Sequence, residues 1–393
     1  MPSAAPPKDP SDQARIRVGA QALEHSAAVT NHLRQCIIEA GGWLAFHRWM
    51  SEVLYAPGLG YYSAGSVKIA SRNAPNQAGL TGDFVTAPEL TPMFGRTVAR
   101  QVAEVLAVCE QPKILEFGAG TGQLARDLLE ALKRMGHQPT YEILELSADL
   151  KQRQQETLSA WSEQVRWTQT PNENFEGVIL ANEVLDAMPV HLVGFNGNSK
   201  VFERGVIWSE QGFAWQDRAA PSHVATALRH RMPALPNYLT EINLAGEAWV
   251  QTLGQCLKKG LVLLIDYGFT AHEYYHPQRA QGTLMCHIQH RAHDNPFFAP
   301  GLQDITAHVD FSAIAKAAHQ SGLDVLGFTS QANFLLNAGL ADQAADMTPS
   351  DRRAVEKLVS EAEMGELFKV LALGRHVEPP LMGFTRSDRR HHL

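Results

Sequence analysis

The sequence predicts an α/β fold built on a Rossmann-like sheet of seven strands. From Lys113 onward, short apolar runs alternate with helical stretches, which is typical of βαβ units and a parallel sheet. The first apolar run passes through a glycine-rich segment, residues 118–122, into an amphipathic helix. The expected strands are residues 113–117, 141–145, 165–169, 177–181, 261–266, 323–329 and 368–373.

Length, composition and charge narrow the class of protein. At 393 residues, with 45% apolar and 19% charged residues, the chain is long enough for one large domain with insertions or for two unequal domains. It contains no run of about 18 apolar residues that could span a bilayer. The formal charge of -7 argues against a nucleic-acid partner, so we expect a protein or small-molecule substrate.

The cysteines and the first residues bear on the cellular compartment. Cys36, Cys109, Cys256 and Cys286 are far apart and form no C-x-x-C pair, which argues against a disulfide framework and fits a reducing compartment. Residues 1–12 lack the apolar or arginine-rich pattern of a targeting signal. We therefore expect a cytoplasmic protein with a disordered tail over residues 1–24.

A helical and lid segment is expected over residues 25–110, before the sheet. Residues 31–54 and 94–108 have helical character, and the loop between them contains turn-rich motifs with aromatic residues. Long structured loops are often functional, so residues 57–88 are a candidate lid. The core is expected over residues 111–189 and 246–393. Residues 190–245 form a substrate-side insertion that starts with a hairpin around Asn196-Gly197.

The glycine-rich segment has the features of a nucleotide cradle. Gly118, Gly120 and Gly122 allow the backbone to approach a ligand closely between a strand and a helix, although such a run also occurs in plain strand-to-helix turns. Glu145 ends the next strand, where a carboxylate can bind both hydroxyls of a ribose. The alternative is that Glu145 caps the following helix. Together, the two features favour an adenosine ligand.

Glu116 distinguishes between adenosine cofactors. Dinucleotide enzymes carry Gly-x-Gly-x-x-Gly, whereas here Glu116 precedes a Gly-x-Gly-x-Gly run by two residues. A carboxylate at this place can bind the charged amino group of an amino-acid-bearing cofactor and would repel a pyrophosphate. The sequence therefore predicts S-adenosyl-L-methionine, with S-adenosyl-L-homocysteine as the product, rather than NAD.

A second constellation follows the fourth expected strand. Residues 182–186 lie at the carboxyl end of a strand beside the first, where doubly wound sheets place their chemistry. Asn182 is expected to contact the cofactor, and Glu183 and Asp186 are the expected catalytic residues. If the methyl acceptor is a guanidinium, these carboxylates can orient it and draw off positive charge as the bond forms. Alternatively, they cap the next helix or lie in a surface loop.

Two groups of ring side chains have weaker signals. His287, His290 and His293 recur every third residue, but helical spacing would turn the imidazoles to different faces and no further ligand completes a set, so no metal site is predicted. Tyr61 and Tyr62 either line an acceptor site or plug a local gap.

With these residues assembled, the chain resembles the MidA family of class I methyltransferases over about residues 31–384. The mitochondrial members of that family are complex I assembly factors that methylate an arginine of a partner subunit. The resemblance therefore implies symmetric arginine dimethylation and a protein substrate, such as a respiratory complex subunit; the insertion shows little match. The motifs that carry the resemblance are PGLGYY at 57–62, GDF at 82–84, TAPE at 86–89, EFGAGTG at 116–122, NEVLDAMP at 182–189, IDYG at 265–268, GTL at 282–284 and DITAHVDF at 304–311.

The motifs at residues 265–268 and 304–311 supply further candidates. His308 lies in a family motif, so the resemblance places it near the methyl-acceptor pocket, and we expect it to be catalytic. Asp310 also fits as the N-cap of the helix that starts near Phe311. Asp266 ends the fifth strand and either faces the cleft or caps a turn.

Three classes of function are compatible with these features: a methyltransferase, an NAD-type oxidoreductase, and a non-catalytic assembly or binding factor that retains a cofactor-binding fold. The glycine loop with its two glutamates and the group at residues 182–186 are both intact in the sequence, which favours a methyltransferase over a non-catalytic factor. A methyltransferase that acts on an acceptor other than arginine is the nearest alternative.

Overall fold

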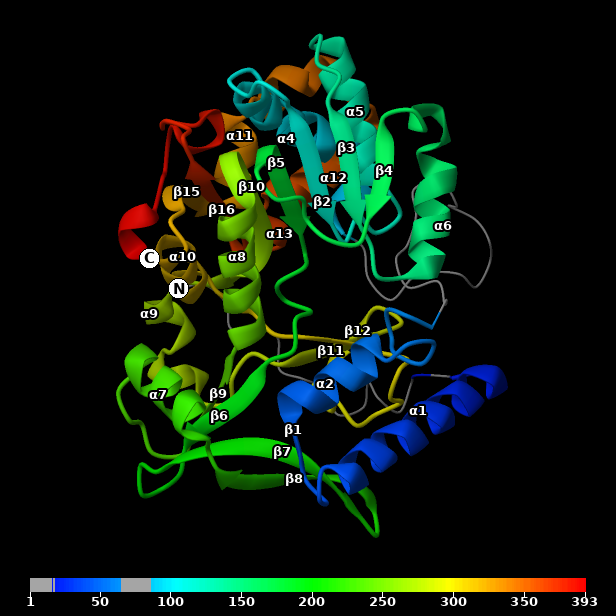
Figure 1. Ribbon diagram of the computed structural model, residues 1–393, viewed down its shortest axis with the longest axis vertical. Helices are drawn as coiled ribbons and strands as arrows, with labels where there is room; N and C mark the ends of the chain where they lie inside the picture. The colour runs from blue at the N-terminus through cyan, green and yellow to red at the C-terminus, as the bar shows by residue number, and fades with distance from the viewer. Residues whose placement is uncertain (1–15, 17, 65–85) are drawn as a thin grey trace.

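The computed structural model describes residues 16, 18–64 and 86–393. Figure 1 shows a core with a central sheet in the upper half of the molecule, and a second sheet with helices α1 and α2 in the lower half. The GDF motif and most of the predicted lid lie outside the described residues.

The central sheet confirms the predicted α/β class. Its strands follow the order β15-β16-β10-β5-β2-β3-β4, and a short eighth strand, β14, pairs with β10. All seven expected strands are present, but the sheet has one strand more than expected. The bounds are β2 Lys113–Phe117, β3 Thr140–Leu144, β4 Val165–Thr168, β5 Phe175–Asn182, β10 Leu257–Phe269, β14 Val309–Asp310, β15 Asp324–Ser330 and β16 Phe368–Arg375.

The alternation of strands and helices predicted a parallel sheet, but the sheet is mixed. Strands β10, β5, β2, β3 and β4 are parallel neighbours, whereas β16 runs antiparallel to both β10 and β15. The prediction failed at β16 because a strand that is buried on both faces reads as the same continuous apolar run in either direction.

Helices cover both faces of the sheet, which makes it doubly wound. Ile114 packs on one face with residues of α4 (Pro92–Leu106), α5 (Gln123–Arg134), α11 (Gln331–Asn337) and α12 (Pro349–Val359). Its neighbour Leu115 packs on the other face with residues of α8 (Leu244–Cys256) and α10 (Phe311–Gln320). Successive strand residues point to opposite faces, so one strand contributes to both cores.

The insertion forms its own sheet and contains the predicted hairpin. Strands β6 (His191–Phe195) and β7 (Val201–Ser209) pair antiparallel across residues 196–200. The complete sheet has the order β1-β7-β6-β9, with β8 paired to β7. The other strands of this sheet are β1 Leu44–Ala45, β8 Gly212–Ala219 and β9 Tyr238–Ile242. Helix α7, Ser222–Arg231, lies between β8 and β9 in the chain.

The N-terminal helix expected over residues 31–54 is two helices. Helix α1 covers Ala20–Glu39 and α2 covers Phe46–Tyr55, with strand β1 between them. The helix ends before Gly41 and Gly42, which have φ values of 77° and 86° in the left-handed region that favours glycine. Residues 20–24 belong to α1 rather than to the predicted tail, because this helix packs its buried face, Ser26 to Ile37, against the body of the protein.

The remaining short elements surround the carboxyl ends of the central strands. They are α3 Ala87–Leu90, α6 Ala148–Thr157, α9 Ala271–Tyr274, β11 Met285–Ile288, β12 Arg291–His293, β13 Asp304–Thr306 and α13 Met364–Leu367. Among the described residues, no helix is both long and apolar enough to cross a membrane.

Candidate functional site

A cavity of about 2230 Å³ opens where the parallel strands of the central sheet end. Its lining includes the glycine loop after β2, the end of β3, the segment after β5 and residues that follow β10. The carboxyl edge of a doubly wound sheet is where ligands bind in this architecture. All predicted site residues except Gly122 line this one cavity: Glu116, Gly118, Gly120, Glu145, Asn182, Glu183, Asp186 and His308.

The glycine loop adopts a backbone that side chains would disturb. Gly118 and Gly120 have φ values of 61° and 55°, in the left-handed region. A Cβ atom at Gly118 would also lie 3.2 Å from the Cγ2 atom of Val184, which is a tight contact. Gly122 has a φ of 84° and precedes α5 as its N-cap residue, so it serves the turn into the helix rather than the cavity wall.

Glu116 is a buried carboxyl group at the end of β2. Its Oε2 accepts a hydrogen bond of 2.8 Å from the hydroxyl group of Tyr141. Burial raises the pKa of Glu116 to about 8, although the Tyr141 hydrogen bond opposes this shift. A cationic amino group bound beside Glu116 would favour its ionised form, so the residue fits the role predicted for it.

Glu145 follows β3 at the cavity and is held by hydrogen bonds to both of its carboxylate oxygens. It lines the cavity, and its Oε1 also accepts a hydrogen bond from the backbone N–H of Ser147, at the start of α6. Its Oε2 accepts from the side chain of Gln154 at 2.8 Å. Burial raises the pKa of Glu145, and these hydrogen bonds oppose the shift.

Gln154 is a positioning residue that the sequence reasoning missed. Besides Glu145, its Nε2 donates to the carbonyl oxygen of Gly120 at 2.9 Å, and its Oε1 accepts from Trp167 Nε1 at 2.9 Å. Its side chain is fully buried and joins the glycine loop, the end of β3 and strand β4. No motif marks it, because a single polar residue on a helix gives no periodic signal.

The segment after β5 is held by one carboxylate. Oδ2 of Asp266 accepts hydrogen bonds from the backbone N–H groups of Val184 at 3.2 Å, Leu185 at 3.0 Å and Asp186 at 3.2 Å. Asp266 therefore caps a turn, one of its two predicted roles, and does not line the cavity. The turn starts at Glu183, whose φ of 55° is unusual for a residue other than glycine and marks local backbone strain.

Asp186, which is buried, and Glu183, which is partly buried, form an acidic pair on the cavity wall. Burial, and next the charge of Asp186, raises the pKa of Glu183 to about 8, although Asn182 donates a hydrogen bond to its Oε1 at 3.0 Å. Burial also raises the pKa of Asp186 to about 6, against a hydrogen bond from Tyr267. Within the described residues, the buried Oδ1 atoms of Asn182 and Asp186 have no hydrogen-bond partner. The wall thus offers acceptor atoms to a ligand that carries N–H groups.

His308 lines the same cavity between aromatic rings. Its imidazole stacks on Phe269 at a centroid distance of 5.1 Å and meets the edge of Tyr267 at 5.1 Å. Burial, and next the charge of Arg279, lowers the pKa of His308 to about 3, so the ring is neutral at physiological pH. Asp310 is the N-cap of α10 through a hydrogen bond from the backbone of Ala313, as the alternative interpretation predicted.

The N-terminal segment contributes to the wall through Tyr55, which the sequence did not single out, and through Tyr62, which it did. Tyr55 donates its hydroxyl hydrogen to the carbonyl oxygen of Ala187 at 2.9 Å, and its ring stacks on Tyr62. Tyr62 donates to Asp304 Oδ1 at 2.8 Å and lines the cavity, whereas Tyr61 is a buried packing residue. The two tyrosines of the sequence motif therefore have different roles.

The TAPE motif also reaches the glycine loop. Glu89, in the short helix α3, accepts a hydrogen bond from the hydroxyl group of Thr121. Both residues line the cavity. This contact explains why a motif that lies before the core is part of the site.

The histidine triplet lies on a hairpin, not on a helix. His287 is in β11 and His293 in β12, while His290 lies at the turn with a φ of 59°. The assumed helical spacing was wrong because period-three spacing also fits two short strands that are joined by a tight turn. His287 lines the cavity, and burial, followed by the charge of His293, lowers its pKa to about 4.

Comparisons with known proteins match this geometry. Residues 97–329 match the family model described as S-adenosyl-L-methionine-dependent methyltransferase. The structure is similar to a crystal structure from Burkholderia thailandensis bound to S-adenosyl-homocysteine, with a TM-score of 0.90, 49% identity and coverage of 96% of this chain and 100% of that one. A second crystal structure from the same organism has a TM-score of 0.87 and 48% identity over 96% of this chain and 100% of that one.

Curated relatives share lower identity over most of the chain. The protein named arginine methyltransferase NDUFAF7 homolog, mitochondrial, of Drosophila melanogaster is 26% identical, with 98% of this chain and 93% of the relative covered. The protein named arginine methyltransferase NDUFAF7, mitochondrial, of Homo sapiens is also 26% identical, with 88% and 84% covered.

These similarities confirm the predicted cofactor, S-adenosyl-L-methionine, and the predicted class of enzyme, a methyltransferase. They contradict the predicted cytoplasmic location, because the curated relatives are named as mitochondrial proteins. That prediction depended on the composition of the first residues and on unpaired cysteines, neither of which identifies a compartment.

Proposed function

Because the chain belongs to the family of S-adenosyl-L-methionine-dependent methyltransferases, we propose that it methylates an arginine side chain of a partner protein. The observation that carries this proposal is the acidic pair on the wall of the cofactor cavity, in which Asp186 is buried and Glu183 is partly buried. The names of the curated relatives give independent support for arginine as the acceptor.

The cavity fits the cofactor in three respects. The left-handed backbone of Gly118 and Gly120 leaves a wall without side chains for a ligand to approach. Glu116 offers a carboxylate to the amino group of the methionine part, and Glu145 offers one to the ribose hydroxyls. Asn182, at the end of β5, has a buried Oδ1 without a partner among the described residues, and this atom can accept a further hydrogen bond from the cofactor. When bound, S-adenosyl-L-methionine supplies an electrophilic methyl group on a sulfonium.

The acidic pair favours a cationic acceptor. Burial raises the pKa of both carboxyl groups, and the charge of Asp186 raises that of Glu183 further, so the two are costly to ionise together in the empty cavity. A guanidinium pairs with carboxylates through several N–H groups at once and would offset that cost. Such pairing would hold the acceptor nitrogen in place and reduce its positive charge, which increases the availability of the lone pair for the methyl group.

The proton balance follows from the same residues. When the nitrogen gains a methyl group, the guanidinium must lose one proton to return to its original charge. Glu183, with a pKa raised to about 8, is a suitable acceptor for that proton. His308 stays neutral, and we propose that its imidazole lines the acceptor side and orients the guanidinium, since its stacking partners fix the ring.

We further propose that the partner is a subunit of a respiratory complex and that the product is symmetric dimethylarginine. Both details come from the resemblance to the MidA family. Residues 190–245 follow directly on Pro189, which lines the cavity, and we propose that this insertion lies on the substrate side and determines which protein segment enters the cavity.

The test is to identify the modified residue. Cell protein from a strain that lacks this gene is incubated with the purified enzyme and deuterium-labelled S-adenosyl-L-methionine, and labelled peptides are identified by mass spectrometry. We expect label on arginine, and fragment ions of symmetric dimethylarginine. A Glu183→Gln enzyme should label about a hundredfold more slowly, whereas Glu163→Gln, which removes an exposed charge outside the cavity, should label as the parent does. Label on a different residue type would overturn the arginine assignment.

A further inference from the structure

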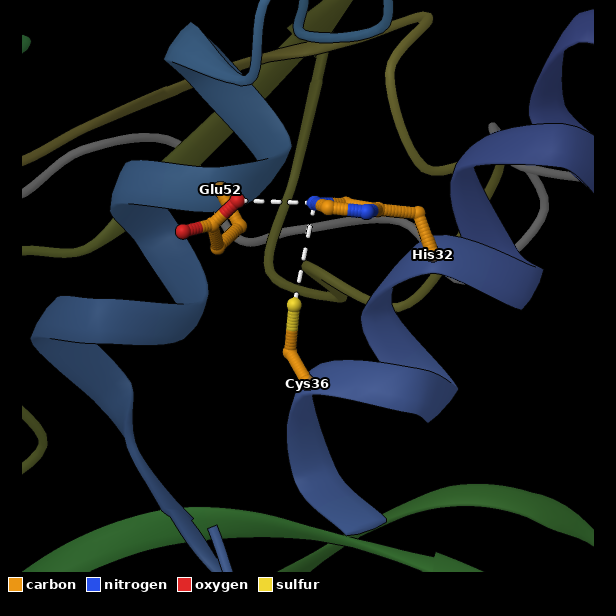
Figure 2. A group of neighbouring side chains, drawn as sticks. All are labelled: His32, Cys36 and Glu52. Atoms are coloured by element: carbon orange, nitrogen blue, oxygen red, sulfur yellow. Dashed lines mark hydrogen bonds and ion pairs between the residues drawn. The ribbon is translucent and has the colours of Figure 1, made fainter. Parts of the chain in front are cut away.

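Three potential metal ligands converge between the two N-terminal helices, and none of them lines the cofactor cavity. His32 and Cys36 lie four residues apart on α1, so their side chains share one face of the helix, and Glu52 faces them from α2. Figure 2 shows the imidazole of His32 pointing at Glu52, with the thiol of Cys36 directed to the same nitrogen. One ligand atom from each residue lies within 4.8 Å of the other two.

The distances suit a tetrahedral cation with sulfur and nitrogen ligands. Zinc bonds of about 2.3 Å to sulfur and about 2.0–2.1 Å to nitrogen place the two ligand atoms about 3.5 Å apart at tetrahedral angles. Cys36 Sγ lies 3.6 Å from His32 Nε2. Glu52 Oε2 lies 2.7 Å from His32 Nε2, and zinc would require a separation of about 3.3 Å, a shift of about 0.6 Å. The side chain of Glu52 is 39% exposed, so it has room to make that shift.

The charges around Cys36 also favour a cation. The carboxylates of Glu52 and Glu39 lie near its thiol, and Arg48 offsets them only in part. A divalent cation would pair with the carboxylate of Glu52 and stabilise a thiolate at Cys36 at the same time.

We propose that His32, Cys36 and Glu52 form a zinc-binding site that joins α1 to α2. Zinc would bind the imidazole nitrogen, the thiolate and the carboxylate, and water would take the fourth position because the side chain of His32 is 33% exposed and leaves one side open. On binding, the thiol releases its proton to solvent. Thiolate and imidazole ligands select zinc over magnesium or calcium, which prefer oxygen.

The site's position suggests a structural role next to the methyl-transfer cavity. Glu52 lies in α2 between Ser51 and Tyr55, both of which line the cavity. A metal that fixes α2 against α1 would hold this part of the wall in place. The proposal does not depend on the identity of the methyl acceptor.

A second cluster of similar composition does not have this geometry. His47, His191 and Glu203 also lie close together, beside a cavity of about 430 Å³. However, the rings of His47 and His191 are stacked, with centroids 3.8 Å apart and an angle of 27° between their planes. The Nδ1 atoms of both histidines face Oε1 of Glu203, at 2.6 Å for His191 and 3.7 Å for His47. The carboxylate therefore already binds an imidazole, and the cluster contains no thiol.

Cobalt titration of the full-length, metal-stripped protein tests the site. Co²⁺ replaces zinc in tetrahedral sites, and a coordinated thiolate produces a charge-transfer band in the near ultraviolet. We expect the band to saturate at one equivalent of Co²⁺, and one equivalent of Zn²⁺ to remove it. Because zinc would bind only the folded state, it should also raise the melting temperature.

Matched variants separate this site from unspecific binding. Cys36→Ser should abolish the band, and His32→Gln and Glu52→Gln should each weaken cobalt binding at least tenfold. Cys109→Ser and His47→Gln should behave like the parent; Cys109 is partly buried, as Cys36 is, but belongs to no such cluster among the described residues. Binding of S-adenosyl-L-homocysteine shows that each variant is folded. An unchanged band in Cys36→Ser, or the absence of saturable binding in the parent, would overturn the proposal.

Discussion

The side-chain amide of Gln154 donates a hydrogen bond of 2.8 Å to Oε2 of Glu145, the carboxylate assigned to the ribose. The same Nε2 atom donates to the carbonyl oxygen of Gly120, so one buried amide connects the carboxylate with the glycine loop. Both parts of the cofactor site therefore depend on a residue that we do not expect to contact the cofactor itself.

Replacement of Gln154 by Met should weaken cofactor binding. The substitution keeps a similar volume but removes the donors to Glu145 and Gly120 and the acceptor for Trp167. Loss of buried hydrogen-bond partners should cost about 1–3 kcal/mol of folding stability and a comparable part of the binding free energy. Calorimetric titration with S-adenosyl-L-homocysteine and a thermal melt measure the two effects. The control is Gln152→Met on the exposed side of α6, and equal affinities for the two variants would remove the positioning role.

Replacement of Gly120 by Val should abolish binding of S-adenosyl-L-homocysteine. The φ of 55° disfavours a branched residue, and the new side chain would project where the ligand approaches. Backbone strain alone could also lower stability, so Gly136→Val is the control. Gly136 has a φ of 84° after α5 and lies outside the cavity lining. If Gly136→Val binds S-adenosyl-L-homocysteine normally and Gly120→Val does not, the loss of binding is due to the altered glycine loop.

Replacement of Glu183 by Gln should slow methyl transfer without weakening cofactor binding. The amide keeps the size of the side chain but cannot carry the charge that pairs with a guanidinium. The expected loss is on the order of 3 kcal/mol, or about a hundredfold in rate. The measurement is single-turnover methylation of an accepted protein at saturating S-adenosyl-L-methionine. Asp186→Asn should cause a similar loss, and the double variant less than the sum, since both residues would hold one guanidinium. Transfer at the parent rate would leave Glu183 as a structural residue.

Glu183 should also make the cofactor-free protein less stable as the pH rises. Its pKa in the folded state is about 8, against an ordinary value of 4.5, so the folded state binds more protons than the unfolded state between these two values. Stability then decreases as the pH rises through this window and changes little from this source below it. Glu183→Gln should therefore be more stable than the parent at pH 8, by up to about 4 kcal/mol, and nearly equal to it at pH 4.

Urea unfolding at both pH values measures this difference in the free energy of unfolding. The control is Glu163→Gln, which removes the same charge from an exposed position. A Glu183 variant with the same pH dependence as the parent would show that the carboxyl group is solvated in the empty cavity.

Local patterns were sufficient for much of the fold and for the cofactor. Strand β2 has the bounds that the sequence predicted, because an apolar run before a glycine-rich turn has few other solutions. Gly118 and Gly120 could be assigned because only glycine adopts their backbone without cost. The place of Glu116, two residues before the first glycine, was enough to favour an amino-acid-bearing cofactor over NAD, and the comparisons confirmed that cofactor.

The sequence by itself therefore determined the α/β class, the cradle and the cofactor, since each depends on residues that are neighbours in the chain. Only the tertiary structure decided that Gln154 supports Glu145, that Asp266 holds the turn at Glu183, and that Cys36 meets Glu52. These contacts join segments that are brought together by packing of the sheet and helices. A hydrogen bond or a ligand pair between distant segments leaves no periodic pattern in either of them, so its existence follows from the fold and not from local sequence.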